Sequence, residues 1–307
     1  FLDCTFGQGG YSKKILEKKN NKIIAVDRDK DVYLYAKKFE KKYNKRFKYE
    51  NIKFSEINKI NVKSKDLRAV IFDLGYSTNQ IKDLSRGLSF KSSGKLNMKM
   101  GLNDFSCHEV ISSMSESNLN KIFKYFGDEK YSKKIARKIV EIRKNKVINT
   151  EDLTKIIDSV KRFKNYKINN STKIFQALRI FVNKEISELI NGLINAFNLI
   201  PVGGVIAVVT FHSIEDKIVK FFFKNYSEVT NSSRYVPNKI NSLKCFELKN
   251  KKPIIPSNAE LKLNPSSRSA KLRFAIKTNE NSNFEEFIRK FKKYIDIEEL
   301  KFDQWKN

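Results

Sequence analysis

The sequence predicts an α/β protein in which an all-helical segment interrupts a Rossmann-like parallel sheet. Two observations support this fold class. Strand and helix signals alternate over about the first hundred residues, as they do in parallel sheets. From Ser106 to about Leu199 the apolar pattern is helical throughout, and strand character returns at 205–211 (VIAVVTF). Strands on both sides of one helical block favour a single interrupted domain over two domains in tandem.

The first four strands are short apolar runs, and helix-like segments follow the first two of them. In order, the sequence predicts strand 1–5, helix 11–18, strand 22–26 (KIIAV), helix 32–43, strand 48–54 and strand 69–74 (AVIFDL). The loop at 75–101 is too long for a plain connection. Long loops in compact α/β domains are usually functional or mobile.

The helical block divides at its capping residues. Ser115 can begin a helix that Gly127 ends. Thr150 opens another, because the two acidic residues after it favour the positive end of the helix dipole. The other expected elements are a lysine-dense helix at 129–144, one long helix at 171–199, a helix at 214–225, an irregular stretch at 227–258, a last strand at 271–276 and a mobile charged helix after 279.

These elements predict three parts of the chain. Residues 1–102 and 200–278 form a discontinuous sheet domain, 103–199 form the helical insertion, and 279–307 form a charged C-terminal tail. The chain starts abruptly in a strand, so we expect an N-terminal segment to be missing. No apolar run is long enough to span a membrane, and no signal-peptide pattern is evident.

Charge is the strongest global feature of the composition. Lys and Arg number 62 against 34 Asp and Glu, which gives a formal net charge of +28. Such an excess favours a polyanionic partner, although biased codon usage with solvated lysines would give the same composition. Cys4, Cys107 and Cys245 are far apart and lack CxxC spacing. We therefore expect no metal site, no disulfide framework and a reducing cytoplasm.

Three glycines, Gly7, Gly9 and Gly10, stand where the first strand turns into a helix. Main chain without Cβ atoms admits a ligand, and a helix N-terminus favours polar or anionic groups. The next strand ends at Asp27, near the spacing at which a carboxylate meets the ribose hydroxyls of an adenosine. Ser12 replaces the last glycine of the dinucleotide fingerprint, which favours a cofactor with adenosine but no phosphate, such as S-adenosylmethionine. A tight turn with nothing bound is the alternative.

Eight motifs in a fixed order carry a family resemblance. They are DCTFGQGGYS (3–12), AVDRD (25–29), DLGYSTNQI (73–81), RGLSF (86–90), GKLNMKM (94–100), TKIFQALRIFVNKEI (172–186), GGVIAVVTFHSIEDKIVKFF (203–222) and NPSSRSAKLR (264–273). Together they resemble the bacterial 16S ribosomal RNA (cytosine-N4)-methyltransferase family, which also has mitochondrial relatives. The resemblance runs from residue 3 to about 277 and leaves out the tail.

The resemblance implies a class I methyltransferase that uses S-adenosylmethionine and acts on 16S rRNA of the small ribosomal subunit. Family members methylate the N4 amine of a cytidine (position 1402) in the decoding centre. The positions that match the family's cofactor contacts are Gly9, Gly10, Tyr11, Asp27, Phe54, Asp73 and Gln80. Two positions depart from the family pattern: Tyr11 replaces the usual histidine, and Asn97 replaces an aspartate near the expected active site.

Asp73 and His212 are the predicted catalytic residues. The N4 amine is a poor nucleophile, so methyl transfer needs in-line alignment and an acceptor for the hydrogen bonds of the amine. Asp73 ends a strand and suits this task, although it could instead cap the amides of the loop. His212, in the motif TFHSIED, is predicted to position the substrate with Ser213, Glu215 and Asp216 in support. A merely hydrogen-bonded histidine is the alternative.

Further residues are predicted to face the RNA. Arg179 and Asn183 lie one turn apart on the long helix, which the resemblance makes a hinge; ordinary interface residues would give the same pattern. The lysine-dense helix at 129–144 is the expected docking face, with a solvated helix as the alternative. Near the last strand, phosphate contacts are expected from Asn264, Arg268 and Arg273.

Two other functions remain open at this stage. One is a non-catalytic RNA-binding or ribosome-assembly module that has kept the fold. The other is a nucleotide-dependent oxidoreductase, which Ser12 and the lack of a second nucleotide-binding half disfavour. Either a monomer or a homodimer is compatible with the sequence.

Overall fold

The computed structural model describes residues 1–90, 92, 94–161, 169–227 and 244–302. By its internal contacts the chain divides into two compact units. The first unit comprises Phe1–Gly75 and Glu188–Phe291, and the second comprises Tyr76–Ser187 and Lys292–Asn307. The predicted domain limits stay a prediction, and each unit is described here by itself.

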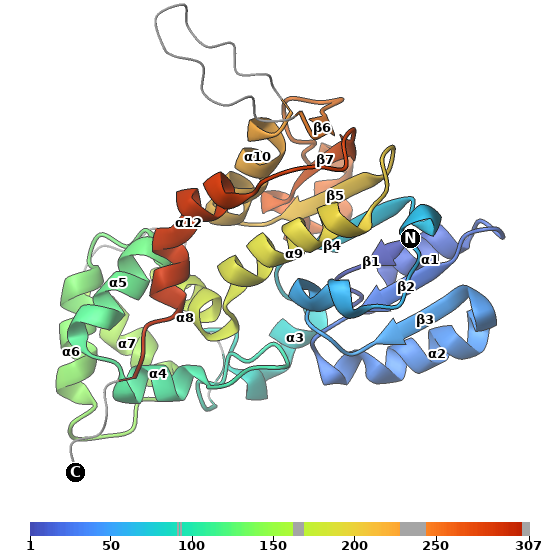
Figure 1. Ribbon diagram of the computed structural model, residues 1–307. Coiled ribbons are helices and arrows are strands. Elements are labelled where there is room, and N and C mark those ends of the chain that lie inside the picture. Colours follow the sequence, from blue (N-terminus) through green and yellow to red (C-terminus); the bar gives the residue numbers. More distant parts are fainter. Residues whose placement is uncertain (91, 93, 162–168, 228–243, 303–307) are drawn as a thin grey trace, which may run out of the picture. The chain divides into compact units, whose positions relative to one another are not determined.

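The first unit is built on a seven-stranded sheet with the order β3-β2-β1-β4-β5-β7-β6 (Figure 1). The five strands from β3 to β5 are parallel, and the last two are antiparallel to their neighbours. This order confirms the predicted Rossmann-like α/β sheet. The strands are β1 Leu2–Asp3, β2 Ile23–Val26, β3 Phe47–Glu50, β4 Ala69–Asp73, β5 Val205–Thr210, β6 Phe246–Glu247 and β7 Lys271–Lys277.

Helices cover the sheet because parallel strands need crossover connections. Helices α1 (Gly10–Leu16) and α2 (Tyr33–Tyr43) follow β1 and β2. They share a buried core with the strands that includes Leu16, Ile23 and Phe47. Burying one such side chain stabilises a fold by about 1.5–3 kcal/mol. The other helices of this unit are most of α9 (Glu185–Leu199), α10 (Ser213–Asn225), α11 (Asn258–Leu263) and the first half of α12 (Glu285–Glu298).

The second unit contains most of the helices that lie between β4 and β5 in the chain. Ser115 caps α5 as predicted, with its side chain accepting the backbone N–H of Asn118, and Gly127 is the last residue of that helix. Helix α7 begins at Thr150 as predicted, and Asn149 is its N-cap. The helices are α3 Thr78–Lys82, α4 Cys107–Ser113, α5 Glu116–Gly127, α6 Ser132–Ile142, α7 Thr150–Val160 and α8 Thr172–Asn183.

The prediction of one long helix at 171–199 is wrong. Lys184 adopts a left-handed backbone conformation with φ 50° and ψ 42°, which ends α8 and separates it from α9. The Lys184 N–H donates to the carbonyl oxygen of Phe181, as expected of a helix that is ending. No glycine or proline marks this break in the sequence.

The C-terminal tail is more than a charged helix. In the first unit Phe287 and Phe291 of α12 are buried, and both rings contact Phe221 of α10. Strand β6 was also missed, because the stretch 227–258 was predicted to be irregular; residues 228–243 of it lie outside the described ranges. No helix in the described ranges has the length and apolar character that a membrane crossing requires.

Candidate active site at the carboxyl edge of the sheet

Carboxylates end three adjacent parallel strands of the first unit. Asp3 is the last residue of β1, Asp73 is the last residue of β4, and Asp27 directly follows β2. In the register of the sheet Asp3 lies beside Ala25 of β2 and Ile71 of β4. Ligands of open α/β sheets bind at this carboxyl edge. With Glu215, whose charge acts on Asp73, these side chains form what we call the acidic site.

Asp3 is a member that the sequence analysis did not single out. Its carboxylate is 1% exposed and accepts the Ser12 hydroxyl at 2.7 Å and the Thr5 N–H at 3.3 Å. Burial raises the pKa of Asp3, while the hydrogen bonds from Ser12 and Thr5 oppose the rise. Ser12, which breaks the dinucleotide fingerprint, therefore helps to hold a buried acid behind the glycine loop. The sequence carries one signal for Asp3, because an acidic residue in the strand before the glycine loop lies near the carboxyl edge of the sheet.

Asp27 ties the glycine loop to the end of β2. One carboxylate oxygen accepts the Gly7 N–H at 2.8 Å, and the other accepts the Asp29 N–H at 2.8 Å. Its own carbonyl oxygen accepts the side-chain amide of Asn51 at 2.7 Å. Burial raises the pKa of Asp27 to about 6 against these two backbone hydrogen bonds. Each carboxylate oxygen keeps a second lone pair, so the group can still accept hydroxyl donors.

Asp73 is an acid of the acidic site with a strongly raised pKa. Burial raises its pKa to about 7, and the negative charges of Asp3 and Glu215 add to the rise. Its N–H donates to the Thr5 hydroxyl at 2.7 Å. Its Oδ1 is buried and has no hydrogen-bond partner among the described residues. A buried carboxylate oxygen without a donor is costly unless a ligand supplies one. The predicted alternative, a carboxylate that caps the loop amides, therefore has no support at Oδ1.

The glycines of the loop have different roles. Gly9 has φ 78°, and a Cβ there would lie 2.5 Å from Cζ of Phe39, so this glycine is required by the fold itself. A Cβ at Gly7 or Gly10 would meet no atom within 4 Å. Main chain is therefore open at Gly7 and Gly10, close to Asp27 and at the start of α1. The open loop and the surrounding carboxylates fit an adenosine cofactor that carries a positive charge.

Tyr11 and Phe54 occupy the margins of this region. Tyr11 lies in the first turn of α1 and is 41% exposed. Burial of its hydroxyl raises the pKa of Tyr11 to about 12, with Asp73 and Asp3 contributing. Phe54 packs edge-on against Phe72 with ring centroids 5.5 Å apart. A Cβ on Gly192 would lie 2.7 Å from its ring, so Phe54 also packs against α9. Its predicted contact with adenine stays a prediction.

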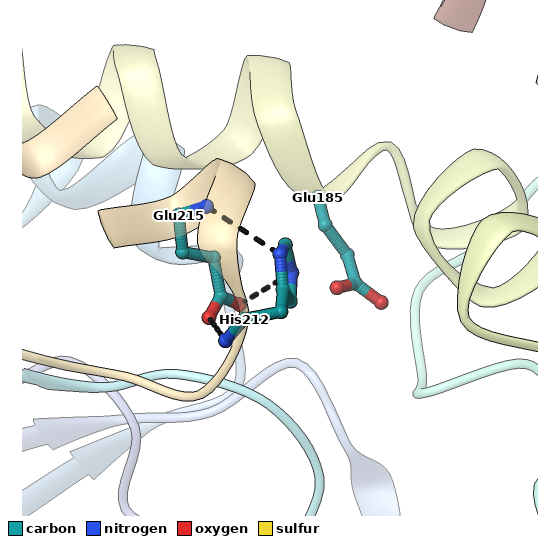
Figure 2. A group of neighbouring side chains, drawn as sticks. All are labelled: Glu185, His212 and Glu215. Atoms are coloured by element: carbon teal, nitrogen blue, oxygen red, sulfur yellow. Dashed lines mark hydrogen bonds and ion pairs between the residues drawn. The ribbon is translucent and has the colours of Figure 1, made fainter. Parts of the chain in front are cut away.

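His212 and Glu215 cap helix α10, as Figure 2 shows. The Glu215 N–H donates to Nδ1 of His212 at 3.4 Å, and Nε2 lies 3.1 Å from the Glu215 carboxylate. That carboxylate also accepts the Phe211 N–H at 2.8 Å. This geometry matches the hydrogen-bonded alternative for His212, whose catalytic role stays a prediction. Glu185, also drawn in Figure 2, belongs to the second unit and pairs there with Arg179.

Several predicted site residues belong to the second unit and are already engaged there. The Gln80 side chain accepts the Ser77 N–H at 2.8 Å in the capping box of α3. Arg179 makes two hydrogen bonds of 2.8 and 2.9 Å with Glu185. Asn183 is fully buried, and its side chain makes four hydrogen bonds, to Met98, Met100, Asn103 and Arg179. The Asn183 side chain therefore holds the loop around Met98 and Asn103 to α8, and both its oxygen and its nitrogen are already bonded within the protein.

The departure at Asn97 also lies in the second unit. Its Oδ1 is buried without a hydrogen-bond partner among the described residues. The predicted docking helix is α6, in which Ile135, Ala136 and Ile139 are buried. Arg143, which follows α6, donates to the carbonyl oxygens of Ile111 and Met114. Arg143 is therefore structural, and docking by the lysines of α6 stays a prediction.

The remaining predicted RNA contacts lie on the first unit. Ser213, Asn264 and Arg268 are exposed, which is compatible with the contacts predicted for them. Arg273 is less accessible, because its side chain is only 11% exposed and its Nε lies 2.8 Å from Asp216; its phosphate contact stays a prediction. Asp216 pairs with β7, and its predicted support of His212 also stays a prediction.

Comparison with known proteins identifies the family. The family model described as the MraW methylase family matches residues 1–278. The chain belongs to the MraW methylase family. It is 42% identical to the ribosomal RNA small subunit methyltransferase H of Orientia tsutsugamushi (strain Boryong), over 91% of this chain and 92% of that protein. The protein of the same name from Ehrlichia canis (strain Jake) is 41% identical over 90% of this chain and 93% of its own length.

Membership of the MraW methylase family makes the chain a methyltransferase with S-adenosylmethionine as its cofactor. A solved protein from Clostridium thermocellum aligns with 91% of this chain and 87% of its own, at a TM-score of 0.40 and 11% identity, too distant to support an argument. The predicted enzyme class and cofactor are confirmed by the family. The oxidoreductase alternative is excluded on the same ground.

Proposed function

We propose that this methyltransferase acts on the N4 amine of a cytidine in 16S rRNA of the small ribosomal subunit, at position 1402. The observation that carries the proposal is the buried Oδ1 of Asp73, which has no partner among the described residues. An exocyclic amine is a hydrogen-bond donor of the kind this oxygen lacks. The names of the Orientia and Ehrlichia relatives support ribosomal RNA as the substrate.

The chain's own residues supply binding and orientation. Asp27 would hold the ribose hydroxyls, and the open main chain at Gly7 and Gly10 would admit the cofactor beside it. When bound, S-adenosylmethionine supplies a methyl group on a positively charged sulfur. The carboxylates of Asp3 and Asp73 provide negative charge near that position, which stabilises a cation electrostatically.

Asp73 has the central role in this proposal. Its Oδ1 would accept a hydrogen bond from the amine, which holds the nitrogen in line for attack and stabilises the positive charge that develops on it. With a pKa raised to about 7, Asp73 can also take up the proton that the methylated amine releases. His212 and Glu215 would fix the start of α10 next to Asp73.

Methylation of isolated ribosomal subunits tests the proposed function. Small subunits from a strain that lacks the modification are incubated with the protein and S-adenosylmethionine, and modified nucleotides are mapped by mass spectrometry. We expect one N4-methylated cytidine. No transfer, or transfer to a different atom, contradicts the proposal. Cofactor binding without any transfer would favour the non-catalytic RNA-binding module instead.

The cellular setting follows from the same proposal. A substrate in the small ribosomal subunit implies action in the cytoplasm. The choice between monomer and homodimer stays a prediction that sedimentation would decide.

A further inference from the structure

A cavity of about 200 Å³ opens beside the antiparallel end of the sheet, and none of its lining residues belongs to the acidic site. Its lining combines positive charge with apolar surface from Phe223 and Leu248. The basic cavity, as we call it, is defined by four side chains: Lys220 and Lys224 of α10, Lys251 after β6, and Arg273 of β7.

Strand pairing explains why a hollow forms here. Strand β6 pairs with β7 up to Glu247, opposite Ile276. Pairing with the edge of β7 resumes only at Ile254, opposite Leu272. The stretch 248–253 therefore faces only 273–275 and must arch away from the edge of the sheet. This arch brings Lys251 to the rim of the cavity.

The charges in the basic cavity are arranged to receive an anion. Asp216 orients Arg273 through a 2.8 Å contact to Nε and is itself shared with Lys271 at 2.9 Å. Within the described part of the chain, no ion pair is formed by Lys220, Lys224 or Lys251. Lys220 and Lys224 stand one helical turn apart and hence on the same face of α10. Of the four cationic side chains that line the cavity, Arg273 pairs with a carboxylate, that of Asp216, so positive charge is in excess.

We propose that the basic cavity binds a backbone phosphate, with its sugar, of the RNA substrate outside the reaction centre; this rests on the proposed function. Small-molecule sites usually enclose roughly 300–1,000 Å³, so this cavity suits one group of a larger polymer. A guanidinium held by its Nε presents its other nitrogens in the planar arrangement that phosphate prefers. The apolar surface of Phe223 and Leu248 can pack against the sugar that carries the phosphate.

Replacement of the three unpaired lysines tests the proposal. The variant Lys220→Gln/Lys224→Gln/Lys251→Gln is compared with Lys41→Gln/Lys45→Gln/Lys65→Gln, which removes the same charge from exposed lysines elsewhere in the first unit. Binding of a 16S rRNA fragment is measured without cofactor over a range of salt concentrations. We expect the cavity variant, and not the control, to reduce the slope of log affinity against log salt by about 1 or more.

Turnover gives a second, independent readout. With undermethylated subunits the cavity variant should show a raised KM, an unchanged kcat and an unchanged affinity for S-adenosylmethionine. Equal behaviour of the two variants in binding and in KM overturns the proposal. So does a result in which the lysines are needed to bind polyglutamate but not RNA, because the partner would then be an acidic protein. The measurement of RNA binding does not depend on methyl transfer. It therefore tests the cavity even if the wild-type protein transfers no methyl group, and a failure of the proposed function is recognised separately.

Discussion

The acidic site and the basic cavity lie in the same unit, yet they differ in both the sign and the burial of their charges. Asp3 is almost fully buried, and Asp73 has a buried oxygen that no described residue bonds, whereas Lys220 and Lys224 are exposed. Buried charges act strongly on a small cationic ligand, because little water screens them. Exposed charges attract a polyanion in a salt-dependent way. In our proposals, the acidic site at the carboxyl ends of the parallel strands carries the methyl transfer, and the basic cavity beside β6 and β7 binds the RNA substrate.

The largest effect is expected from removing the central charge of the acidic site. Asp73→Asn should lower kcat by about 10²–10³-fold, because an amide stabilises developing positive charge poorly. The pKa of Asp73 is raised from 3.8 to about 7 in the folded protein, so its contribution to stability falls as the pH rises from about 4 to about 7, and the full loss is present at pH 8. Asp73→Asn should therefore raise the free energy of unfolding at pH 8 by about 1 kcal/mol or more. Rate measurements and urea unfolding check both expectations.

The exposed carboxylate of Asp66 supplies a matched control for Asp73. Asp66→Asn should leave kcat and stability unchanged. A loss of activity in Asp73→Asn that is accompanied by unfolding would contradict an electrostatic role for Asp73.

Gly9 and Gly10, beside the acidic site, distinguish a glycine that the fold requires from one that leaves room for the cofactor. Gly9→Ala should destabilise the protein by about 1–3 kcal/mol, since the backbone is left-handed and the new Cβ meets Phe39. Gly10→Ala should keep the stability, because space is open there, and should weaken cofactor binding. Thermal unfolding and calorimetric titration with S-adenosylmethionine separate the two. Equal loss of stability in both variants would show that the loop has no open face.

The pH dependence of cofactor binding tests the acidic site without mutation. A cationic ligand favours ionised carboxylates, so affinity should be highest above pH 7. It should fall as the pH drops through about 7 and again through about 6, where Asp73 and then Asp27 take up protons. Calorimetry between about pH 5 and pH 8 checks this. Asp73→Asn should remove the upper step, and an affinity that is constant over this range would break the comparison.

The smallest effect is expected at Tyr11. Its pKa is raised to about 12, so the phenol stays protonated and uncharged at neutral pH. Tyr11→Phe should change kcat less than tenfold, well below the roughly 10²–10⁴-fold loss expected for a general acid or base. Steady-state kinetics decides the matter. A larger loss would make Tyr11 a proton donor and explain the departure from the family's histidine.

Asp27 and the glycine loop beside it could be predicted because they lie in one local pattern. The turn from strand to helix at Gly7–Gly10 and the acid at Asp27 are close in sequence, so spacing alone relates them. Asp3 was missed because the first strand was predicted to run to residue 5, which places Asp3 inside the strand and not at its carboxyl end. The break at Lys184 was missed because its left-handed conformation is set by packing and not by a glycine.

Of the basic cavity, the sequence predicted only Arg273 as a phosphate contact. Its charged residues come from α10, the segment after β6, and β7, and only strand pairing brings them together. Composition showed the excess of lysine but not where it gathers. The burial of Phe287 and Phe291 in α12 was not predicted either, because the many charged residues of this segment suggested an exposed helix.

Helix α10 has a consequence for redesign. Its first turn carries Glu215, a later turn carries Lys220, and Asp216 fastens the helix to β7. A helix of this length is stiff, so a change in its tilt at one end also moves the other end. A variant meant to change the affinity for RNA should therefore alter Lys251, which lies outside α10, and leave the residues of α10 unchanged.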